Sequence, residues 1–313
     1  MSELLRFLSA DTGLPVSDLL RIINTAPRRY KIFFIPKRSG GMREIAQPAR
    51  ELKLLQRAVV TRLISQLPVH AAARAYRSGL SIKDNALPHA GGGPILKMDF
   101  RDFFPSIKSD DWERYCKKNN LLSIDDLNIS SLILFRRVKG KKALRLSIGA
   151  PSSPALSNVL MFDFDTRVSA EAERRKINYT RYADDLTFSG QRAGMLRDMV
   201  SEVAKAVRQI EFPRLQVNDD KTTFITPSRR RTVTGVTLTN DGNLSLGRDR
   251  KRLISSKVHH ASLGKLSTEE LREAAGQLAF ANVVEPEFVA RLERRYGEIV
   301  SQIRKVSRSS GSS

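Results

Sequence analysis

The sequence has very little cysteine and histidine, which argues against two classes of protein. Its 313 residues contain one cysteine, Cys116, and four histidines. A single cysteine cannot form a disulfide within the chain, a pattern typical of proteins from a reducing cytoplasm. His89 and the pair His259-His260 have no cysteine or carboxylate neighbours at the spacing of a zinc site. The sequence therefore favours neither a disulfide-stabilised protein nor a zinc protein.

Acidic residues are few relative to basic ones. Lys and Arg number 54 against 33 Asp and Glu, which gives a formal net charge of +21 and a pI near 10.5. This excess predicts strong, salt-sensitive attraction to a polyanion, and nucleic acid is the first candidate. A membrane surface is the second, but the chain has no apolar run of about 20 residues and no signal-peptide pattern. With 41% hydrophobic residues, the chain is long enough for a core of two or three subdomains.

Three aspartates at the ends of short apolar runs are the main chemical feature of the sequence. Asp99 follows the run 95–98, and the pair Asp184-Asp185 follows the run 177–182. Both runs have strand character, so each carboxylate group is expected at a strand end or in a tight turn. An isolated Asp-Asp pair is usually only a solvated turn, and the rest of the sequence decides between these readings.

Gathering three carboxylates costs several kcal/mol in repulsion and desolvation unless cations neutralise them. Hard oxygen ligands without clustered cysteine or histidine select Mg2+ or Mn2+ over zinc. Two such ions a few Å apart would stabilise the attacking and leaving oxygens of a phosphoryl transfer. The three aspartates therefore predict a two-metal site.

The surroundings of these aspartates resemble those in reverse transcriptases. Tyr-Ala-Asp-Asp at 182–185 and Asp-x-x-x-Phe-Phe at 99–104 look like the palm motifs of that family. Gly-Ala-Pro-Ser-Ser-Pro lies between them at 149–154, and the blocks 215–222 and 233–236 follow in the family's order. The resemblance implies an RNA-directed DNA polymerase. It also implies an α/β (α+β) right-hand fold with fingers, a palm of mixed sheet and helices, and a helical thumb.

Two shorter elements narrow the resemblance to the retron reverse transcriptases. Asn-Ala-x-x-His at 85–89 and Val-Thr-Gly at 233–235 are similar to elements of that family. Such an enzyme binds the structured RNA encoded beside it (msr-msd) and starts from the 2′-hydroxyl of an internal guanosine. It uses deoxynucleotides to make a branched RNA–DNA molecule (msDNA). The resemblance also implies an antiphage defence system with a separate effector protein.

Two alternatives remain open at this stage. The first is another small bacterial reverse transcriptase, such as a group II intron-like enzyme, with a different primer and the same metal site. The second is a non-catalytic RNA-binding scaffold that holds its RNA or an effector. Loss of one of the three aspartates would have favoured the scaffold, and none is lost.

The resemblance assigns catalytic and metal-binding roles. The expected metal ligands are Asp99, Asp184, Asp185 and the backbone carbonyl of Phe100, around two Mg2+ ions. Lys221 is expected to protonate the leaving pyrophosphate. The alternatives for Lys221 are a purely electrostatic contact and a surface lysine.

Residues for the incoming nucleotide are expected in a hairpin over 30–46, at the end of the motif 99–104 and in the block 149–154. They are Arg43, Lys37, Phe104, Gly149, Ala150 and Pro151. Arginine provides a fork that matches phosphate, but a solvated hairpin tip is the alternative for both basic residues. Phe104 resembles the bulky residue that excludes a ribose 2′-hydroxyl, with an ordinary buried aromatic as the alternative. One departure is Ile148, where the family often has glutamine.

RNA-binding residues are expected in the two retron-like elements and in a basic helix near the C-terminus. They are Asn85, His89, Val233, Thr234, Gly235, Arg248 and Arg252. The basic helix is well suited to hold a duplex through its phosphates without reading sequence. For His89 the alternative is an imidazole that bonds nearby backbone rather than RNA.

The expected organisation has four parts. Residues 1–95 form an N-terminal helical layer and fingers, and residues 96–246 form the palm with a fingers insertion around 107–147. A helical thumb covers 247–306, with helices at 248–263, 268–279 and 286–306, and a disordered tail covers 307–313. One long palm helix is expected to bury Leu156, Val159, Leu160, Phe164 and Val168.

Overall fold

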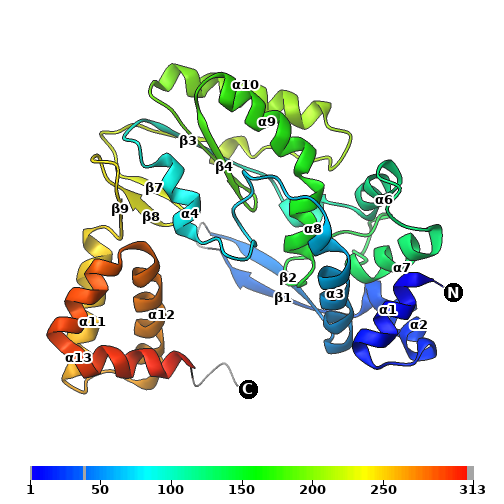
Figure 1. Cartoon of the computed structure of the whole chain (residues 1–313), viewed down its shortest axis with the longest axis horizontal. Helices are drawn as coiled ribbons and strands as arrows, with labels where there is room; N and C mark the ends of the chain where they lie inside the picture. Colours follow the sequence, from blue (N-terminus) through cyan, green and yellow to red (C-terminus); the bar gives the residue numbers. More distant parts are fainter. Residues whose placement is uncertain (1, 38–39, 309–313) are drawn as a thin grey trace.

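The computed structural model describes residues 2–37 and 40–308. Its elements form an arch, with a central sheet at the top, N-terminal helices at one end and a three-helix bundle at the other (Figure 1). Residues 38–39 of the expected basic hairpin tip and residues 309–313 of the expected tail lie outside the described residues. No helix in the described ranges is long and apolar enough to cross a membrane.

The central sheet carries the aspartates. Its four strands lie in the order β4-β5-β3-β6, and neighbouring strands pair antiparallel. The strands are β3 (Ile95–Asp99), β4 (Asn178–Tyr182), β5 (Asp185–Ser189) and β6 (Thr223–Ile225). Strands β3 and β4 confirm the two apolar runs expected before the aspartates.

The two faces of β3 belong to two different hydrophobic cores. Successive side chains of a strand point to opposite faces. Leu96 and Met98 join the larger core, together with the N-terminal helices and the helices that cover the central sheet. Ile95 joins the smaller core with the C-terminal bundle and the second sheet. This strand therefore links both halves of the molecule.

Three helices cover the Leu96 face of the sheet. They are α8 (Ser153–Leu160), α9 (Phe162–Arg174) and α10 (Ala193–Gln209). The single long helix expected over Leu156 to Val168 was wrong, because Met161 (φ −86°, ψ 2°) separates α8 from α9. Leu156, Val159, Leu160, Phe164 and Val168 are nevertheless all buried, as the pattern indicated.

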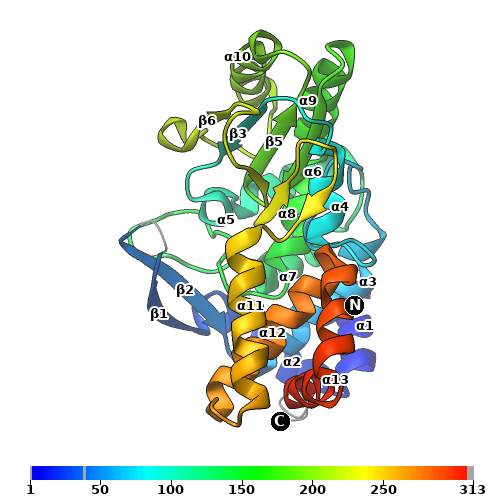
Figure 2. The same cartoon turned by 90° about the vertical axis from the view of Figure 1, so that its left-hand side faces the viewer.

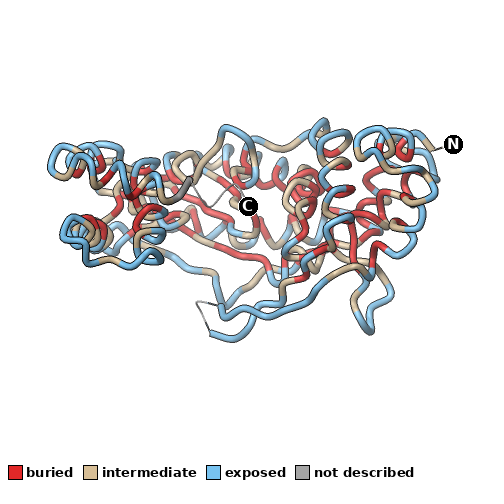
Figure 3. Tube along the Cα trace, turned by 90° about the horizontal axis from the view of Figure 1, so that it is seen from below, coloured by how far each residue is buried: buried red, intermediate tan, exposed pale blue. Residues whose placement is uncertain are grey.

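The N-terminal half packs around the same core. Helices α1 (Glu3–Thr12), α2 (Val16–Thr25) and α3 (Arg50–Arg62) lie beside α7 (Ile124–Leu134), and α6 (Ser109–Lys118) packs on α7. The hairpin of β1 (Tyr30–Pro36) and β2 (Met42–Pro48) emerges from this layer, as predicted. Figure 3 shows the hairpin reaching away from the buried interior as an exposed segment.

The C-terminal bundle has its own core. Its helices are α11 (Arg248–Ser262), α12 (Thr268–Val284) and α13 (Pro286–Arg308), and they lie below the small sheet of β7 (Arg231–Val233), β8 (Val236–Leu238) and β9 (Leu244–Ser245) (Figure 2). The short helices α4 (Ile82–Ala86) and η3 (Leu87–His89) pack between this sheet and the palm.

Two helix ends differ from those expected. Helix α12 continues five residues beyond Ala279, because Ala281 and Val284 extend its buried stripe until the segment before Pro286. Helix α13 continues through Arg308, so the expected disordered tail does not begin at Ser307. Gly297 interrupts α13 with non-helical backbone angles (φ 25°, ψ −96°).

Candidate active site

The register of the central sheet brings the three aspartates together. Asp99 is the last residue of β3 and lies directly opposite Asp185, the first residue of β5. Asp184 lies in the two-residue turn between β4 and β5. Directly opposed side chains of an antiparallel pair have Cβ atoms about 4.5–5.5 Å apart. The expected carboxylate cluster is therefore present at one end of the sheet.

Electrostatics confirm that these carboxylates repel one another. Desolvation, and then repulsion from Asp184 and Asp99, raises the pKa of Asp185 to about 6. Asp185 nevertheless keeps a solvent-exposed surface. Desolvation and then the charge of Asp99 also raise the pKa of Asp184. Like charges in a partly desolvated site shift carboxyl pKa values upward in this way. The cluster is an unfavourable arrangement of charge that a bound cation would relieve.

Lys221 provides one positive charge within the cluster. It belongs to the turn η4 (Asp219–Lys221), and its Nζ donates to both carboxylate oxygens of Asp99 at 3.0 and 2.9 Å. This hydrogen bond raises the pKa of Lys221. The lysine expected near the triphosphate is therefore at the site and paired with a carboxylate.

The Phe100 backbone also faces the cluster. Asn218 N–H donates to the Asp99 carbonyl at 2.7 Å, and Arg101 N–H donates to the Gln216 carbonyl at 2.9 Å. These bonds make Phe100 and Val217 a non-hydrogen-bonded pair, so the Phe100 carbonyl points away from Val217 and toward the β5 side. That is the side of Asp185.

An exposed tyrosine that the sequence analysis did not single out borders the site. Tyr76 is 52% exposed and has a left-handed backbone (φ 61°). Its ring centroid lies 6.4 Å from that of Phe104, and the charges of Asp184, Asp185 and Arg43 all act on its hydroxyl. A non-glycine residue with positive φ marks a strained backbone, and such strain concentrates at functional sites.

The hairpin contributes Arg43 to this side of the site. Arg43 is exposed on β2, and its charge lowers the pKa of Asp184 against the larger effects of burial and Asp99. Lys37 lies at the end of β1, where its backbone N–H donates to the Gly41 carbonyl at 2.9 Å. Within the described part of the chain, nothing links the Lys37 side chain to the carboxylates. The structure therefore brings Arg43, and not Lys37, to the cluster.

The loop before α8 packs directly on the hairpin. Ala46 N–H donates to the Ile148 carbonyl at 2.8 Å. Gly149 has φ +113°, and a Cβ there would meet the Ala46 carbonyl oxygen and the Ile45 side chain at 3.1 Å. Only glycine combines this backbone angle with such a close approach. Ala150 is buried and Pro151 is half-buried behind it.

Comparison with known proteins identifies the family. The family model described as reverse transcriptase (RNA-dependent DNA polymerase) matches residues 35–238. A retron Ec83 reverse transcriptase from Escherichia coli is 39% identical over 283 residues, covering 89% of this chain and 90% of that protein. A retron Ec86 reverse transcriptase from the same organism is 32% identical, with 93% and 90% covered. The chain belongs to the retron reverse transcriptases.

One solved structure illustrates the more distant matches. The foamy viral protease-reverse transcriptase in complex with double-stranded DNA is 18% identical, with a TM-score of 0.46. The match covers 88% of this chain and 43% of that one. The expected reverse transcriptase fold and RNA-directed DNA polymerase activity are confirmed by the family match.

The structure corrects three of the expected RNA contacts, because the side chains of Asn85, His89 and Val233 are buried. Val233 is fully buried, and Asn85 and His89 are each 1% exposed. The His89 ring nitrogens bond the hydroxyls of Ser189 and Thr180, both at 2.8 Å. Burial lowers the pKa of His89 to about 3, so the imidazole is neutral. These side chains have no exposed surface to offer RNA.

The two retron-like elements instead contact each other. Asn85 Nδ2 donates to Thr234 Oγ1 at 3.4 Å, and Thr234 Oγ1 donates to the Ile82 carbonyl at 3.4 Å. Thr234 and Gly235 form the β7–β8 turn, and the Gly235 carbonyl accepts from Arg250 Nη1 on α11 at 2.9 Å. The elements therefore form a joint between the palm and the C-terminal bundle. This contact was not predictable, because the two elements lie about 150 residues apart in the chain.

The basic residues of α11 remain accessible. Arg248 and Arg252 are exposed, as an interaction with phosphates requires. A cavity of about 490 Å3 opens where α11 meets the small sheet, and Arg230, Arg248 and Lys251 are among the residues that line it. This cavity lies beside the C-terminal bundle, and none of the three aspartates lines it.

The carboxylate site fits a hard divalent cation in its chemistry. Reverse transcriptases use divalent metal ions, and three carboxylates with the Phe100 carbonyl are suitable ligands. Among residues 2–37 and 40–308, however, no three carboxylate, histidine or cysteine side chains already surround one point. The Lys221 ammonium pairs with both oxygens of Asp99.

The repulsion in the site gives a prediction about stability. Folding raises the pKa of Asp185 from 3.8 to about 6, so the folded state binds more protons than the unfolded state between these pH values. The associated stability therefore falls as the pH rises through this window, and Asp185→Asn should remove the cost. With chelator at pH 7.5, we expect the variant to melt about 1–3 °C above wild type, a small gain because solvent screens this residue. The gain should vanish near pH 4.

Melting curves with and without Mg2+ check this prediction. Added Mg2+ should raise the Tm of the wild-type protein more than that of Asp185→Asn, because the amide offers the ion less charge. If the two proteins have equal Tm values at every pH and respond equally to Mg2+, Asp185 does not belong to a repulsive cation site.

Proposed function

We propose that this reverse transcriptase copies a cognate structured RNA into DNA, starting from an internal guanosine 2′-hydroxyl, and so makes branched msDNA. The observation that supports the chemistry is the pairing of Asp99 opposite Asp185, with Asp184 in the adjoining turn. The names of the relatives support the retron assignment. We further propose that the RNA–DNA product acts with a separate effector protein in antiphage defence, in the cytoplasm, where the free thiol of Cys116 is stable.

In this proposal the three aspartates and the Phe100 carbonyl hold two Mg2+ ions, for which Mn2+ can substitute. When bound, the ions lower the pKa of the priming hydroxyl and neutralise the triphosphate and the pyrophosphate. Fingers, palm and thumb are assigned to residues 1–95, 96–246 and 247–306.

Arg43 and Lys221 act on the phosphates of the incoming nucleotide. Arg43 lies on the exposed hairpin, close enough for its charge to act on Asp184, and its guanidinium matches the oxygens of a phosphate group. Lys221, which pairs with Asp99 in this structure, would be free to donate a proton from its ammonium to the pyrophosphate if bound cations took its place at that carboxylate. A phosphate contact by Lys37 has less support than one by Arg43, because the Lys37 side chain has no described link to the carboxylates.

Phe104 and Tyr76 together border the sugar of the nucleotide. Phe104 is half-buried near the start of α5 (Phe103–Ser106). Its ring lies 6.4 Å from that of Tyr76, on whose hydroxyl the charges of Asp184 and Asp185 act, which supports a position near the carboxylates. A ring in this position excludes a 2′-hydroxyl by its volume. The loop of Gly149, Ala150 and Pro151 packs on strand β2 and supports the β1–β2 hairpin.

RNA binding is assigned to the exposed arginines of α11 rather than to the buried side chains of Asn85, His89 and Val233. Arg248 and Arg252 hold the RNA phosphates, while Thr234 and Gly235 support α11 through Arg250. Because phosphate contacts carry no sequence information, selection of the cognate RNA depends on its shape and on where the joint places α11.

Amide substitutions test the chemistry. Asp99→Asn and Asp185→Asn should each lower primer extension on an RNA template with Mg2+ by about a thousandfold or more, because the amide removes a metal ligand's charge. RNA binding, measured on the same preparations, should stay close to wild type. Asp163→Asn is the matched control, since Asp163 lies on α9 in an exposed pair with Lys118. Extension near the control level in either variant would refute the assignment.

Competition between sugars tests Phe104. Phe104→Val should raise ribonucleotide incorporation relative to deoxynucleotide incorporation by about tenfold or more, because it opens space beside the 2′-position. Extension with both nucleotide types in one reaction measures the ratio. Phe7→Ala is the control, because Phe7 is an exposed aromatic on α1, far from the site. An unchanged ratio would make Phe104 an ordinary packing residue.

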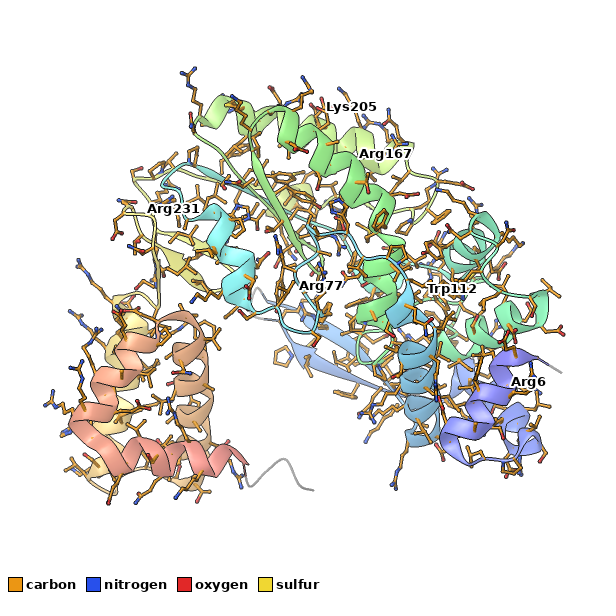
Figure 4. All side chains as sticks on the ribbon, in the orientation of Figure 1. Arg6, Arg77, Trp112, Arg167, Lys205 and Arg231 are labelled. Carbon is orange, nitrogen blue, oxygen red and sulfur yellow. The ribbon has the colours of Figure 1, made fainter. Side chains whose placement is uncertain are left out.

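Salt dependence tests the role of α11. Arg252→Ala should weaken RNA binding and reduce the slope of log affinity against log salt by about one unit, the effect of one lost phosphate contact. Lys205→Ala provides the comparison, because Figure 4 shows Lys205 on the outer helices, away from the thumb. If both variants keep the wild-type slope, the RNA does not follow α11.

A further inference from the structure

We propose that Arg181 is the positioning residue of the Asp184–Asp185 turn, holding it in the geometry that catalysis needs through its side-chain contact with the Ala183 carbonyl. The inference rests on the polymerase activity of the preceding section. Arg181 lies on β4, on the face opposite the carboxylates, and touches neither substrate nor metal in this proposal. It acts through the backbone of the turn.

The turn itself lacks the residues that usually stabilise such a geometry. Only two residues, Ala183 and Asp184, connect β4 to β5. The first of them has φ +59°, a position that glycine or asparagine normally occupies in a two-residue hairpin. Left-handed backbone costs a residue such as alanine roughly 1–2 kcal/mol. Repulsion between the adjacent carboxylates adds to this strain. An interaction from outside the turn must therefore hold it.

Arg181 provides this interaction from a fully buried position. Its side chain is completely inaccessible, and so is that of its ion-pair partner Asp165 on α9. Nε and Nη2 donate to the two Asp165 oxygens at 2.9 and 2.6 Å. Nη1 donates to the Ala183 carbonyl at 3.1 Å and to Asn158 Oδ1 at 3.1 Å. The guanidinium thus spans from the palm helices to the backbone of the turn.

The same residue also joins the segment that carries Tyr76. Arg181 N–H donates to the Ala72 carbonyl, and the Arg181 carbonyl accepts from Arg74 N–H, both at 2.8 Å. Asn158, which follows the 149–154 block on α8, donates to the Ala75 carbonyl at 2.9 Å. The Arg181 guanidinium thus bonds α8, α9 and the turn, while its backbone and its partner Asn158 bond the segment that carries Tyr76.

The chemistry of arginine explains why this residue type is needed. A buried ion pair seldom adds net stability compared with hydrocarbon side chains of similar size, so stability alone is a weak reason for the pair. A planar fork of donors, by contrast, reaches three acceptors in fixed directions. A lysine at 181 would keep the charge beside Asp165 but could not also hold Asn158 and the Ala183 carbonyl in place.

Two variants separate positioning from stability. Arg181→Lys keeps the charge, and the double variant Arg181→Met with Asp165→Leu replaces the pair by apolar side chains, which preserves packing without a buried charge. For both, we expect kcat for RNA-templated extension to fall about tenfold or more, because small displacements of reacting groups cost large factors in rate. The Mg2+ concentration for half-maximal rate should rise several-fold, while the KM for deoxynucleotide changes less. Melting curves show whether each variant is folded at the assay temperature.

Arg175→Lys is the matched control. Arg175 also pairs with carboxylates in the palm helices, Glu171 and Glu202, but has no described contact with the turn. It should leave the Mg2+ dependence unchanged. If the Arg181 variants fold and keep wild-type kcat and Mg2+ dependence, or if neither folds at the assay temperature, the pair serves stability and the inference is overturned. An inactive wild-type enzyme in the same assay would refute the proposed function instead.

Discussion

Antiparallel pairing of β3 with β5 is the constraint on which the site depends. The pairing places Asp99 opposite Asp185 and leaves Asp184 in the turn beside them. Because side chains alternate along a strand, the same register buries Leu96 and Met98 in the larger core. A shift of one residue would bury the aspartates and expose the core residues. The packing energy of the core therefore holds the carboxylates together against their mutual repulsion.

The positive charges around the site come from three separate parts of the chain. Lys221 follows the palm helices in sequence, Arg43 lies on the hairpin, and Lys97 lies two residues before Asp99 on β3. Each lowers the pKa of at least one of the carboxyl groups or pairs with it. Burial lowers the pKa of Lys97. The chain thus offsets part of the repulsion itself, but the pKa values of Asp184 and Asp185 remain raised.

Local sequence predicted the features that depend on local interactions. The strand before Asp99, the hairpin predicted at 30–46 and the three C-terminal helices follow from apolar periodicity, glycine-rich turns and proline positions, and the structure contains them. The break between α8 and α9 at Met161 has no glycine or proline to mark it, so periodicity alone predicted one helix. Arg181 carries no local signal either, because a charged residue beside a motif looks solvated until Asp165 is placed next to it by the fold. Similarly, Asn85 and His89 are polar residues whose burial results only from contacts with distant segments.

The hydrogen bonds of the buried residues Asn85 and His89 bear on how the proposed RNA would be selected. The bundle of α11, α12 and α13 has a core separate from that of the palm, and the two cores meet on opposite faces of β3. Near this boundary, Asn85 bonds Thr234, and His89 bonds Ser189 and Thr180. Within the smaller core's half, Arg250 bonds the Gly235 carbonyl. These bonds determine where the basic face of α11 lies relative to the carboxylates. If the RNA binds α11 as proposed, it could place its priming hydroxyl at the cluster only if its shape matched that separation, and the buried residues would then influence RNA choice without touching the RNA.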